Sequence, residues 1–162
     1  MSGDDSDEQH KLIFANAGAA LYHAQVLEEA VTSFILIISV SKKRVPSKAA
    51  FDALDQVLRA KTLGGLLKEA RKHLKITAAA EKQIDTALDQ RNELVHHFFK
   101  NHAEAFFSEA GRNRMIAKLE GYQSSFCTAA DTVGSIGKKI LAKFGVTDEM
   151  LAQKVEEMKK NA

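Results

Sequence analysis

The chain has 162 residues, of which 45% are hydrophobic and 27% charged, a composition that suits one domain able to bury a core. One proline and nine glycines supply too few turn residues for a protein of many strands. A single cysteine, Cys127, excludes an internal disulfide framework and a cysteine-based structural zinc site, and it fits a reducing compartment. The net charge of +2 permits nucleic-acid binding without requiring it.

The first ten residues are expected to form a disordered acidic tail, because they hold four acidic residues, no Lys or Arg, and little that could be buried. A signal peptide needs a basic start, and no window reaches the roughly 20 apolar residues that cross a bilayer. The sequence therefore predicts a cytoplasmic protein with no membrane contact. Residues 11–145 are expected to form a helical bundle, and residues 146–162 a peripheral C-terminal helix.

The first predicted helix covers residues 12–40. Its apolar positions recur at helical spacing, and the stripe expected to face the core is Leu12, Ala15, Ala19, Tyr22, Val26, Ala30, Ser33, Ile37 and Val40. Residues 30–40 are rich in Val, Ile and Phe, so a strand is the competing interpretation there. Continuity with the preceding segment favours one long helix that ends before Pro46, with its second half buried on every side.

Three hydroxyl residues are predicted to cap the next helices at their N-termini: Ser47, Thr62 and Thr77. The helix after Ser47 is expected to direct one apolar face inward, formed by Ala50, Phe51, Leu54, Val57 and Leu58. In the helix after Thr62, the pair Gly64–Gly65 indicates a bend or the close approach of another backbone. The helix after Thr77 is expected to run to about Phe107.

The fifth predicted helix extends from about residue 108 to residue 144. Its expected core-facing stripe is Met115, Leu119, Tyr122, Phe126, Ala129, Val133, Ile136, Ile140 and Phe144. Gly145 is expected to cap its C-terminal end, and Thr147 to begin a short charged helix. These elements predict an all-α fold, an up-and-down bundle of four to five long helices plus a short peripheral C-terminal helix.

Polar residues that could carry chemistry gather on the fourth predicted helix. One of its stripes is polar and is formed by Asp85, Asp89, Asn92 and His96. Arg91 lies instead on the apolar stripe, between Leu88 and Val95. A guanidinium is rarely buried without a partner, so Arg91 is expected to bind an anion, reach a cleft or lie at a subunit interface. The alternative is an arginine whose charged end reaches solvent from a half-buried face.

The segment Arg91-Asn92-Glu93-Leu94-Val95-His96 resembles the R-x4–6-H signature of the HEPN superfamily, all-α domains of which many are ribonucleases in toxin–antitoxin, phage-defence or RNA-processing systems. The resemblance implies that Arg91 holds the scissile phosphate and that His96 transfers a proton as the ribose 2′-OH attacks. Asn92 would support them, and a 2′,3′-cyclic phosphate would form without a metal or cofactor. A guanidinium fork suits a phosphate, and histidine titrates near neutral pH.

His97, Glu93 and Asp89 are secondary candidates; for Glu93, Asp89, Asp85 and His102 the simpler interpretation is a solvated helix face. Arg91 and His96 point about 140° apart around a helix, so one chain presents them in different directions. A homodimer with a two-fold seam along this helix would bring Arg91 of one chain towards His96 of the other. RNA is the expected substrate, and an antitoxin or another protein a further partner.

Two alternatives to a ribonuclease stay open. The first is a catalytically silent HEPN-like dimer that binds RNA, a nucleotide or a protein; Arg91 and His96 facing one open cleft would favour the enzyme. The second uses Glu93 and His96 as the Glu-x-x-His half-motif of ferritin-like di-metal bundles. Such a site needs a second Glu-x-x-His and two further glutamates, but the chain contains this motif once, so no metal is predicted.

Overall fold

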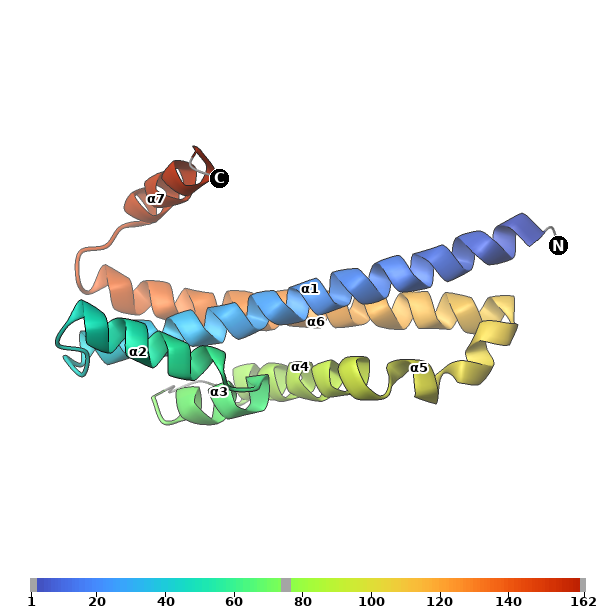
Figure 1. The fold of residues 1–162 in the computed structure, drawn as a ribbon, viewed down its shortest axis with the longest axis horizontal. Coiled ribbons are helices and arrows are strands. Elements are labelled where there is room, and N and C mark those ends of the chain that lie inside the picture. Colours follow the sequence, from blue (N-terminus) through green and yellow to red (C-terminus); the bar gives the residue numbers. More distant parts are fainter. Residues whose placement is uncertain (1–2, 74–76, 161–162) are drawn as a thin grey trace. The chain divides into compact units, whose positions relative to one another are not determined.

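The computed structural model describes residues 3–73 and 77–160, and within these ranges every regular element is a helix (Figure 1). The prediction of an all-α protein is confirmed. The elements are α1 (Gly3–Ser41), α2 (Lys48–Arg59), α3 (Leu63–Arg71), α4 (Ala78–His96), α5 (Phe98–Asn101), the 3₁₀ helix η1 (Ala103–Phe107), α6 (Glu109–Ala142) and α7 (Asp148–Lys160). The chain divides into two compact units, each of which is described below by itself.

Unit 1 comprises Met1–Glu29 and Lys75–Asp131, and it contains the first part of α1, then α4, α5, η1 and most of α6. Its core is built from three helices, with fully buried side chains that include Ile13, Ala20, Leu27, Ile84, Ala87, Met115, Leu119 and Phe126. Polar contacts join the same helices, since the Gln123 amide donates to Asn16 Oδ1 at 2.9 Å. Figure 1 shows α1 beside α6 over this stretch.

The predicted core stripe of α1 is wrong in unit 1. Leu12, Tyr22 and Val26 from that stripe are 49%, 62% and 38% exposed. The buried side of the helix is the opposite one, formed by Ile13, Ala17, Ala20, Ala24 and Leu27. This segment is apolar on both sides, so helical periodicity alone selects neither, and the packing of α4 and α6 decides which is buried.

The first residues of α1 also differ from the prediction, because Gly3–His10 are helical and not an unstructured tail. Arg112 of α6, only 5% exposed, donates to Gln9 Oε1 at 2.6 Å and to the Phe106 carbonyl at 2.7 Å. The His10 ring stacks on Phe106 with centroids 5.6 Å apart. These contacts hold the helix start against α6 and η1 and account for its order.

α1 is also more apolar than the sequence analysis allowed. The stretch Ser6–Ser41 is long enough to cross a membrane and contains an 18-residue window of mean hydropathy 1.5. Half of that window is buried inside the protein, and the core helix of a protein in water meets the same criterion. The cytoplasmic location therefore stays a prediction.

The helix after Thr77 is shorter than predicted. α4 ends at His96, because His97 leaves the helical conformation with φ −136° and ψ −16°. α5 and η1 then lead to α6, whose first turn is capped by the Ser108 hydroxyl accepting from the Gly111 amide at 3.1 Å. A Cβ at Gly111 would collide with the Ala105 carbonyl oxygen, so the close passage of η1 over α6 requires glycine there.

Unit 2 comprises Ala30–Leu74 and Thr132–Ala162, and its helices begin where the hydroxyl residues predict. The Ser47 hydroxyl accepts from the Ala50 amide at 3.2 Å, and the Thr62 hydroxyl from the Gly65 amide at 3.3 Å. Its buried side chains include Val31, Phe34, Ile35, Ile38, Leu58, Leu63, Leu66, Leu67 and Val133. The second half of α1 is thus a helix and not a strand, and most of its apolar side chains are buried.

Two expectations for α2 and α3 need correction. In the predicted apolar face of α2 only Leu58 is buried, whereas Phe51 and Val57 are 36% and 56% exposed. α3 runs from Leu63 to Arg71 through its glycines, and a Cβ at Gly65 would meet Lys61 at an ordinary 3.5 Å. Alanine would also fit at position 65, so a close approach of another backbone does not explain Gly65.

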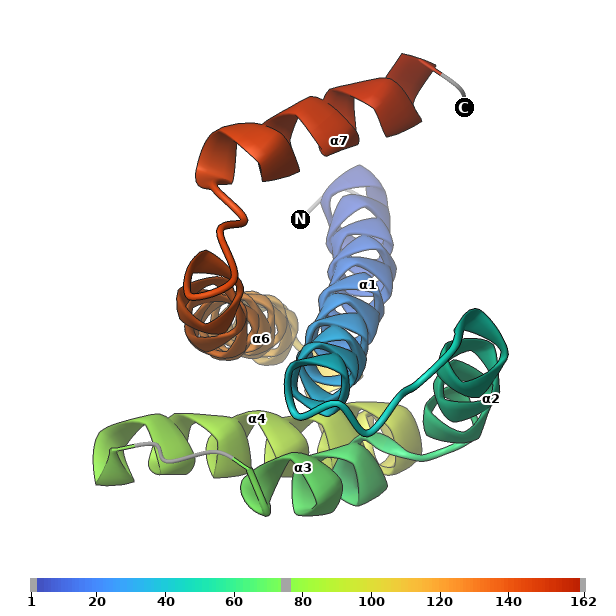
Figure 2. The same ribbon diagram turned by 90° about the vertical axis from the view of Figure 1, so that its left-hand side faces the viewer.

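The end of α6 follows the sequence signals. Gly145 adopts φ +79°, which favours glycine and ends the helix, and the Thr147 hydroxyl accepts from the Met150 amide at 3.3 Å to start α7. No residue described in α7 is buried. Figure 2 shows α7 joined to α6 by a connection without helix.

Two phenylalanines from the core stripe predicted for residues 108–144 differ in burial. Phe126 is 0% exposed and Phe144 is 62% exposed. We expect Phe126→Ala to lower the free energy of unfolding by about 3–5 kcal/mol, because the substitution leaves a cavity. Phe144→Ala should change it by no more than about 0.5 kcal/mol. Urea denaturation followed by circular dichroism measures both, and equal losses would contradict the burial of the stripe described here.

Candidate functional site

The segment Arg91–His96 forms the last turns of α4. The Thr77 hydroxyl starts this helix by accepting from the Ala80 amide at 3.2 Å, as predicted. Ile84, Ala87 and Leu94 turn one face into the core of unit 1 and so fix the rotation of α4. The break at His97 places His96 at the exposed end of a rigid element.

Arg91 is held by an acidic residue of α1. Its Nη2 donates to Glu28 Oε1 at 3.1 Å, and the two side chains are 20% and 29% exposed. Of the three expected environments for this arginine, an anion, a cleft or a subunit interface, the structure shows the first, and the anion is a carboxylate of the same chain. The contact uses one of the five N–H groups of the guanidinium, so the partly exposed group retains donors for a second anion.

The other two residues of the predicted catalytic set face solvent. Asn92 and His96 are exposed, as are Asp85 and Asp89 on the same stripe. His97 is exposed too, with its ring centroid 6.0 Å from that of His96. Five residues of helix separate Arg91 from His96, which places them about 140° apart. One chain therefore presents Arg91 beside α1 and His96 to solvent, in different directions.

Glu93 is not part of a solvated face. Its Oε1 accepts from Lys118 Nζ at 2.7 Å, and its Oε2 accepts from the Tyr122 hydroxyl at 2.5 Å. His102 Nε2 lies 3.4 Å from Glu93 Oε1 and 3.1 Å from Lys118 Nζ. The four side chains tie the end of α4 and the α5–η1 segment to α6, which the simpler interpretation of Glu93 and His102 missed. The available signal was Tyr122, whose hydroxyl needs a partner when it lies on a buried stripe.

This network fixes the protonation of its members. Burial raises the pKa of the Glu93 carboxyl, but the hydrogen bonds from Lys118 and Tyr122 and the Lys118 charge outweigh it, so the pKa lies below its usual value. Burial, the hydrogen bond to Glu93 and its charge raise the pKa of the Tyr122 hydroxyl far above its usual range. Glu93 is therefore an anion and Tyr122 a neutral donor at neutral pH.

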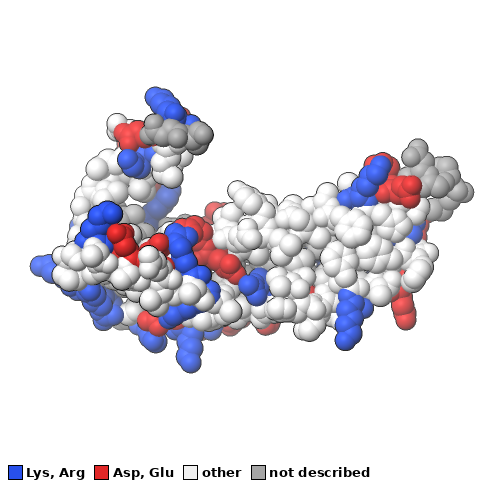
Figure 3. All heavy atoms as spheres, in the orientation of Figure 1, with Lys and Arg blue, Asp and Glu red and all other residues white. Residues whose placement is uncertain are grey.

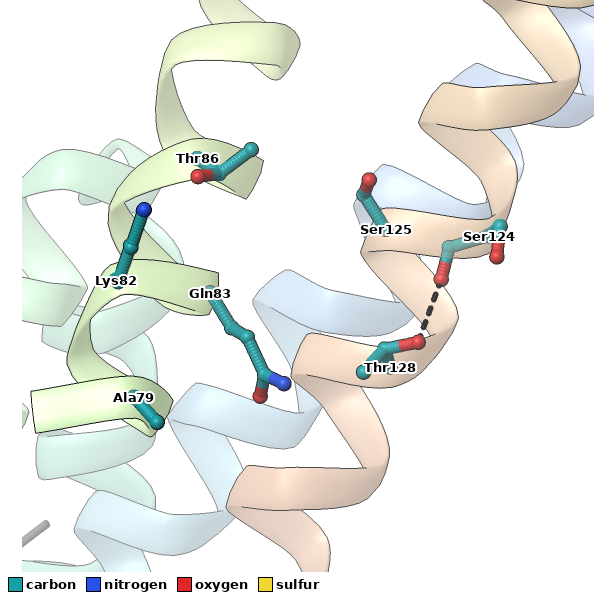
Figure 4. Close-up of a pocket in the computed structure, with 7 residues that line it drawn as sticks. All are labelled: Ala79, Lys82, Gln83, Thr86, Ser124, Ser125 and Thr128. Carbon is teal, nitrogen blue, oxygen red and sulfur yellow. Dashed lines mark hydrogen bonds between the residues drawn. The ribbon is translucent and has the colours of Figure 1, made fainter. Parts of the chain in front are cut away.

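A pocket lined largely by polar residues lies at the start of α4, away from Arg91–His96. Figure 4 shows its lining residues, which come from α4 and α6: Ala79, Lys82, Gln83, Thr86, Ser124, Ser125 and Thr128. Its volume is about 350 Å³, and the Thr128 hydroxyl donates to the Ser124 carbonyl at 2.9 Å. One ammonium, an amide and four hydroxyls could bind a small polar ligand. The sequence analysis identified none of these residues.

The geometry offers no support to a di-metal site. Glu93 is engaged by Lys118 and Tyr122, while His96 faces solvent. Among the residues that the structure describes, no group of three His, Cys, Asp or Glu side chains is arranged to hold a metal ion. The only cysteine of the chain, Cys127, contacts His23, with Sγ 3.2 Å from Nδ1.

Comparison of the chain with protein-family models, with curated proteins and with solved structures found no match. The resemblance of Arg91–His96 to the HEPN signature therefore stays a prediction from the sequence.

The Glu93 network predicts a pH-dependent contribution to stability. Because its folded-state pKa is depressed, Glu93 contributes fully above its ordinary value of 4.5, and this contribution is lost as pH falls through the folded-state value. Glu93→Gln should lower the free energy of unfolding by about 1–3 kcal/mol at pH 7. The difference from the parent protein should shrink in acid. Denaturation from pH 3 to pH 7 measures it, with the exposed Glu120→Gln as control; a difference that stays constant would contradict the assignment.

Proposed function

We propose that this protein is a HEPN-like, metal-independent endoribonuclease. The observation that carries the proposal is the state of Arg91, a partly exposed guanidinium oriented by a single contact with Glu28. That arrangement positions the group while leaving most of its donors for phosphate oxygens. We further propose that the helices pack as an up-and-down bundle, the architecture that the helix pattern of the sequence predicts.

In the proposed reaction the nucleophile belongs to the substrate. The ribose 2′-oxygen attacks the adjacent phosphorus, the bond to the 5′-oxygen breaks, and a 2′,3′-cyclic phosphate and a 5′-hydroxyl remain. Arg91 holds the phosphate oxygens and stabilises the developing charge, while His96 moves a proton. Asn92, exposed one residue after Arg91, supports the substrate.

The proposed site is completed by a second copy of the chain. His96 and Arg91 point in different directions within one chain, so a homodimer would combine Arg91 from one copy with His96 from the other. Asp89 lies on the exposed stripe of His96, and His97 lies beside it, so both could border the composite cleft. Glu93 is a positioning residue, because it contacts Lys118 and Tyr122 and not the exposed stripe.

The alternative is a silent HEPN-like dimer that binds RNA, a nucleotide or a protein such as an antitoxin. The Arg91–Glu28 pair is the observation that favours it, since the carboxylate already occupies one donor of the guanidinium. A pair of this kind can be purely structural. The two functions differ in whether RNA is cut.

Substitutions in α4 test the ribonuclease directly. His96→Ala should slow cleavage of total RNA by about 10²–10⁴-fold, because proton transfer is lost. Arg91→Ala should abolish cleavage, and Arg91→Lys should not restore it, because lysine lacks the bidentate fork. His97→Ala should cost much less than His96→Ala, and Arg114→Ala, at an exposed position of α6, is a control that should retain full activity. Equal losses in His96→Ala and His97→Ala would contradict the assignment of His96.

The chemistry predicts a second set of outcomes. Cleavage should persist in EDTA and leave 2′,3′-cyclic phosphate ends, and a substrate with one 2′-deoxy residue at the cut site should resist. Mass spectrometry of the fragments measures the ends. Efficient cutting of the deoxy substrate would overturn the mechanism, and inactivity of the parent protein on every RNA would select the binding module.

A further inference from the structure

The outer side of α1 in unit 1 lacks the charged residues that an exposed helix face normally carries. From Leu12 to Leu27 the sequence contains no Asp, Glu, Lys or Arg. One side of this segment packs into the core, yet Leu12, Tyr22 and Val26 on the other side are 49%, 62% and 38% exposed. A surface helix usually places polar and charged residues opposite its buried stripe, and this one does not.

The uncharged surface continues from α1 onto α4 and α5. Phe14, 59% exposed, contacts Phe99 of α5, which is 40% exposed, with ring centroids 5.8 Å apart. Leu21 lies two turns after Phe14, and Val95 one turn before Phe99; they are 41% and 44% exposed. We call these side chains together the uncharged face: Leu12, Phe14, Leu21, Tyr22, Val26, Val95 and Phe99. Figure 3 shows a broad area over the first part of α1 and α5 with few charged side chains.

The size of the uncharged face is that of a protein interface. The exposed fractions of its seven residues, each multiplied by the full surface area of that residue type, give a total exposed area of roughly 600 Å². An area of about 600 Å² is at the upper end for the largest apolar patch of a monomer, and patches of this size are often functional. Specific interfaces begin near about 600 Å² for each partner, so this face is large enough for a stable complex.

The spacing of the α1 residues indicates what covers the face. Leu12, Ala15, Ala19, Tyr22 and Val26 follow the alternating three- and four-residue steps of helices that pack as pairs. The strip combines the larger side chains of Leu12, Tyr22 and Val26 with two small ones, Ala15 and Ala19. In an antiparallel pair, Tyr22 of one copy would lie over Ala15 and Ala19 of the other, and a two-fold axis repeats the contact.

The lack of charge points to the same occupant. An acidic or basic partner would gain no electrostatic complementarity from the strip between Leu12 and Leu27. An uncharged strip of equal length is complementary to this face, and a second copy of this chain supplies one. We infer that the uncharged face pairs two copies of this chain through α1. The seam predicted along the helix of Arg91 would then lie mainly on α1, with Val95 and Phe99 at its edge.

Gly18 provides a test that spares the protomer. It is exposed on the outer side of α1, and a Cβ there would meet nothing within 4 Å. Gly121 of α6 is also exposed and equally open, so it is a matched control outside the uncharged face. Arginine favours helix more than glycine, so both Gly18→Arg and Gly121→Arg should fold, as circular dichroism checks.

Sedimentation velocity at 1–100 μM then measures the mass. The parent protein and Gly121→Arg should sediment as dimers, at twice 17.8 kDa. Gly18→Arg should weaken dimerisation at least tenfold, and Tyr22→Glu should do the same. A monomeric parent protein would overturn the inference, as would a dimer that Gly18→Arg leaves intact. Binding of a monomer to phosphatidylcholine–phosphatidylglycerol vesicles would assign the face to lipid instead.

The pairing is separable from RNA cleavage, because mass and cleavage are measured independently. A dimer that cuts no RNA would retain the pairing and remove the ribonuclease. A Gly18→Arg monomer that cuts RNA as fast as the parent protein would retain the ribonuclease but remove its composite site.

Discussion

Burial of one side of α1 against α4 and α6 is the interaction on which unit 1 depends. Ile13 and Leu27 are 0% exposed, and this sets the rotation of α1 about its axis. With that rotation fixed, Glu28 turns towards α4 and meets Arg91, and Tyr22 turns outward. The rotation of α1 thus has two consequences. It brings Glu28 to Arg91, and it leaves an apolar surface exposed.

The end of α4 is held from two directions by polar contacts. Arg91 bonds to Glu28 on α1, and Glu93 bonds to Lys118 and Tyr122 on α6. Both contacts are partly buried, so solvent screens them less than a surface ion pair. Between them, Asn92 and His96 remain open to solvent on a helix that both contacts hold. A site needs this combination of fixed backbone and accessible side chains.

The uncharged face and the candidate site meet on the same elements. Val95 lies one turn after Arg91, and Phe99 one turn farther along the chain. A second copy seated on this face would lie beside the turn of α4 that carries Arg91. Pairing of two copies would then cover the apolar surface and also bring a second group towards Arg91.

Local signals in the sequence determined the helices and their ends. Ser47, Thr62 and Thr77 cap helices, and Gly145 ends one, because capping depends on residues within a single turn. The core stripe of α6 was also readable as far as Val133, since polar residues separate its apolar positions and leave one choice of face.

Tertiary structure alone decided which side of α1 is buried, where α4 ends, and which groups pair with Arg91 and Glu93. α1 is apolar on both sides, so only the helices packed against it distinguish Leu12 from Ile13. The Arg91–Glu28 contact joins residues 63 positions apart, and Tyr122–Glu93 joins residues 29 apart. Periodicity and capping act over three or four residues, whereas these pairs exist only once separate helices have packed.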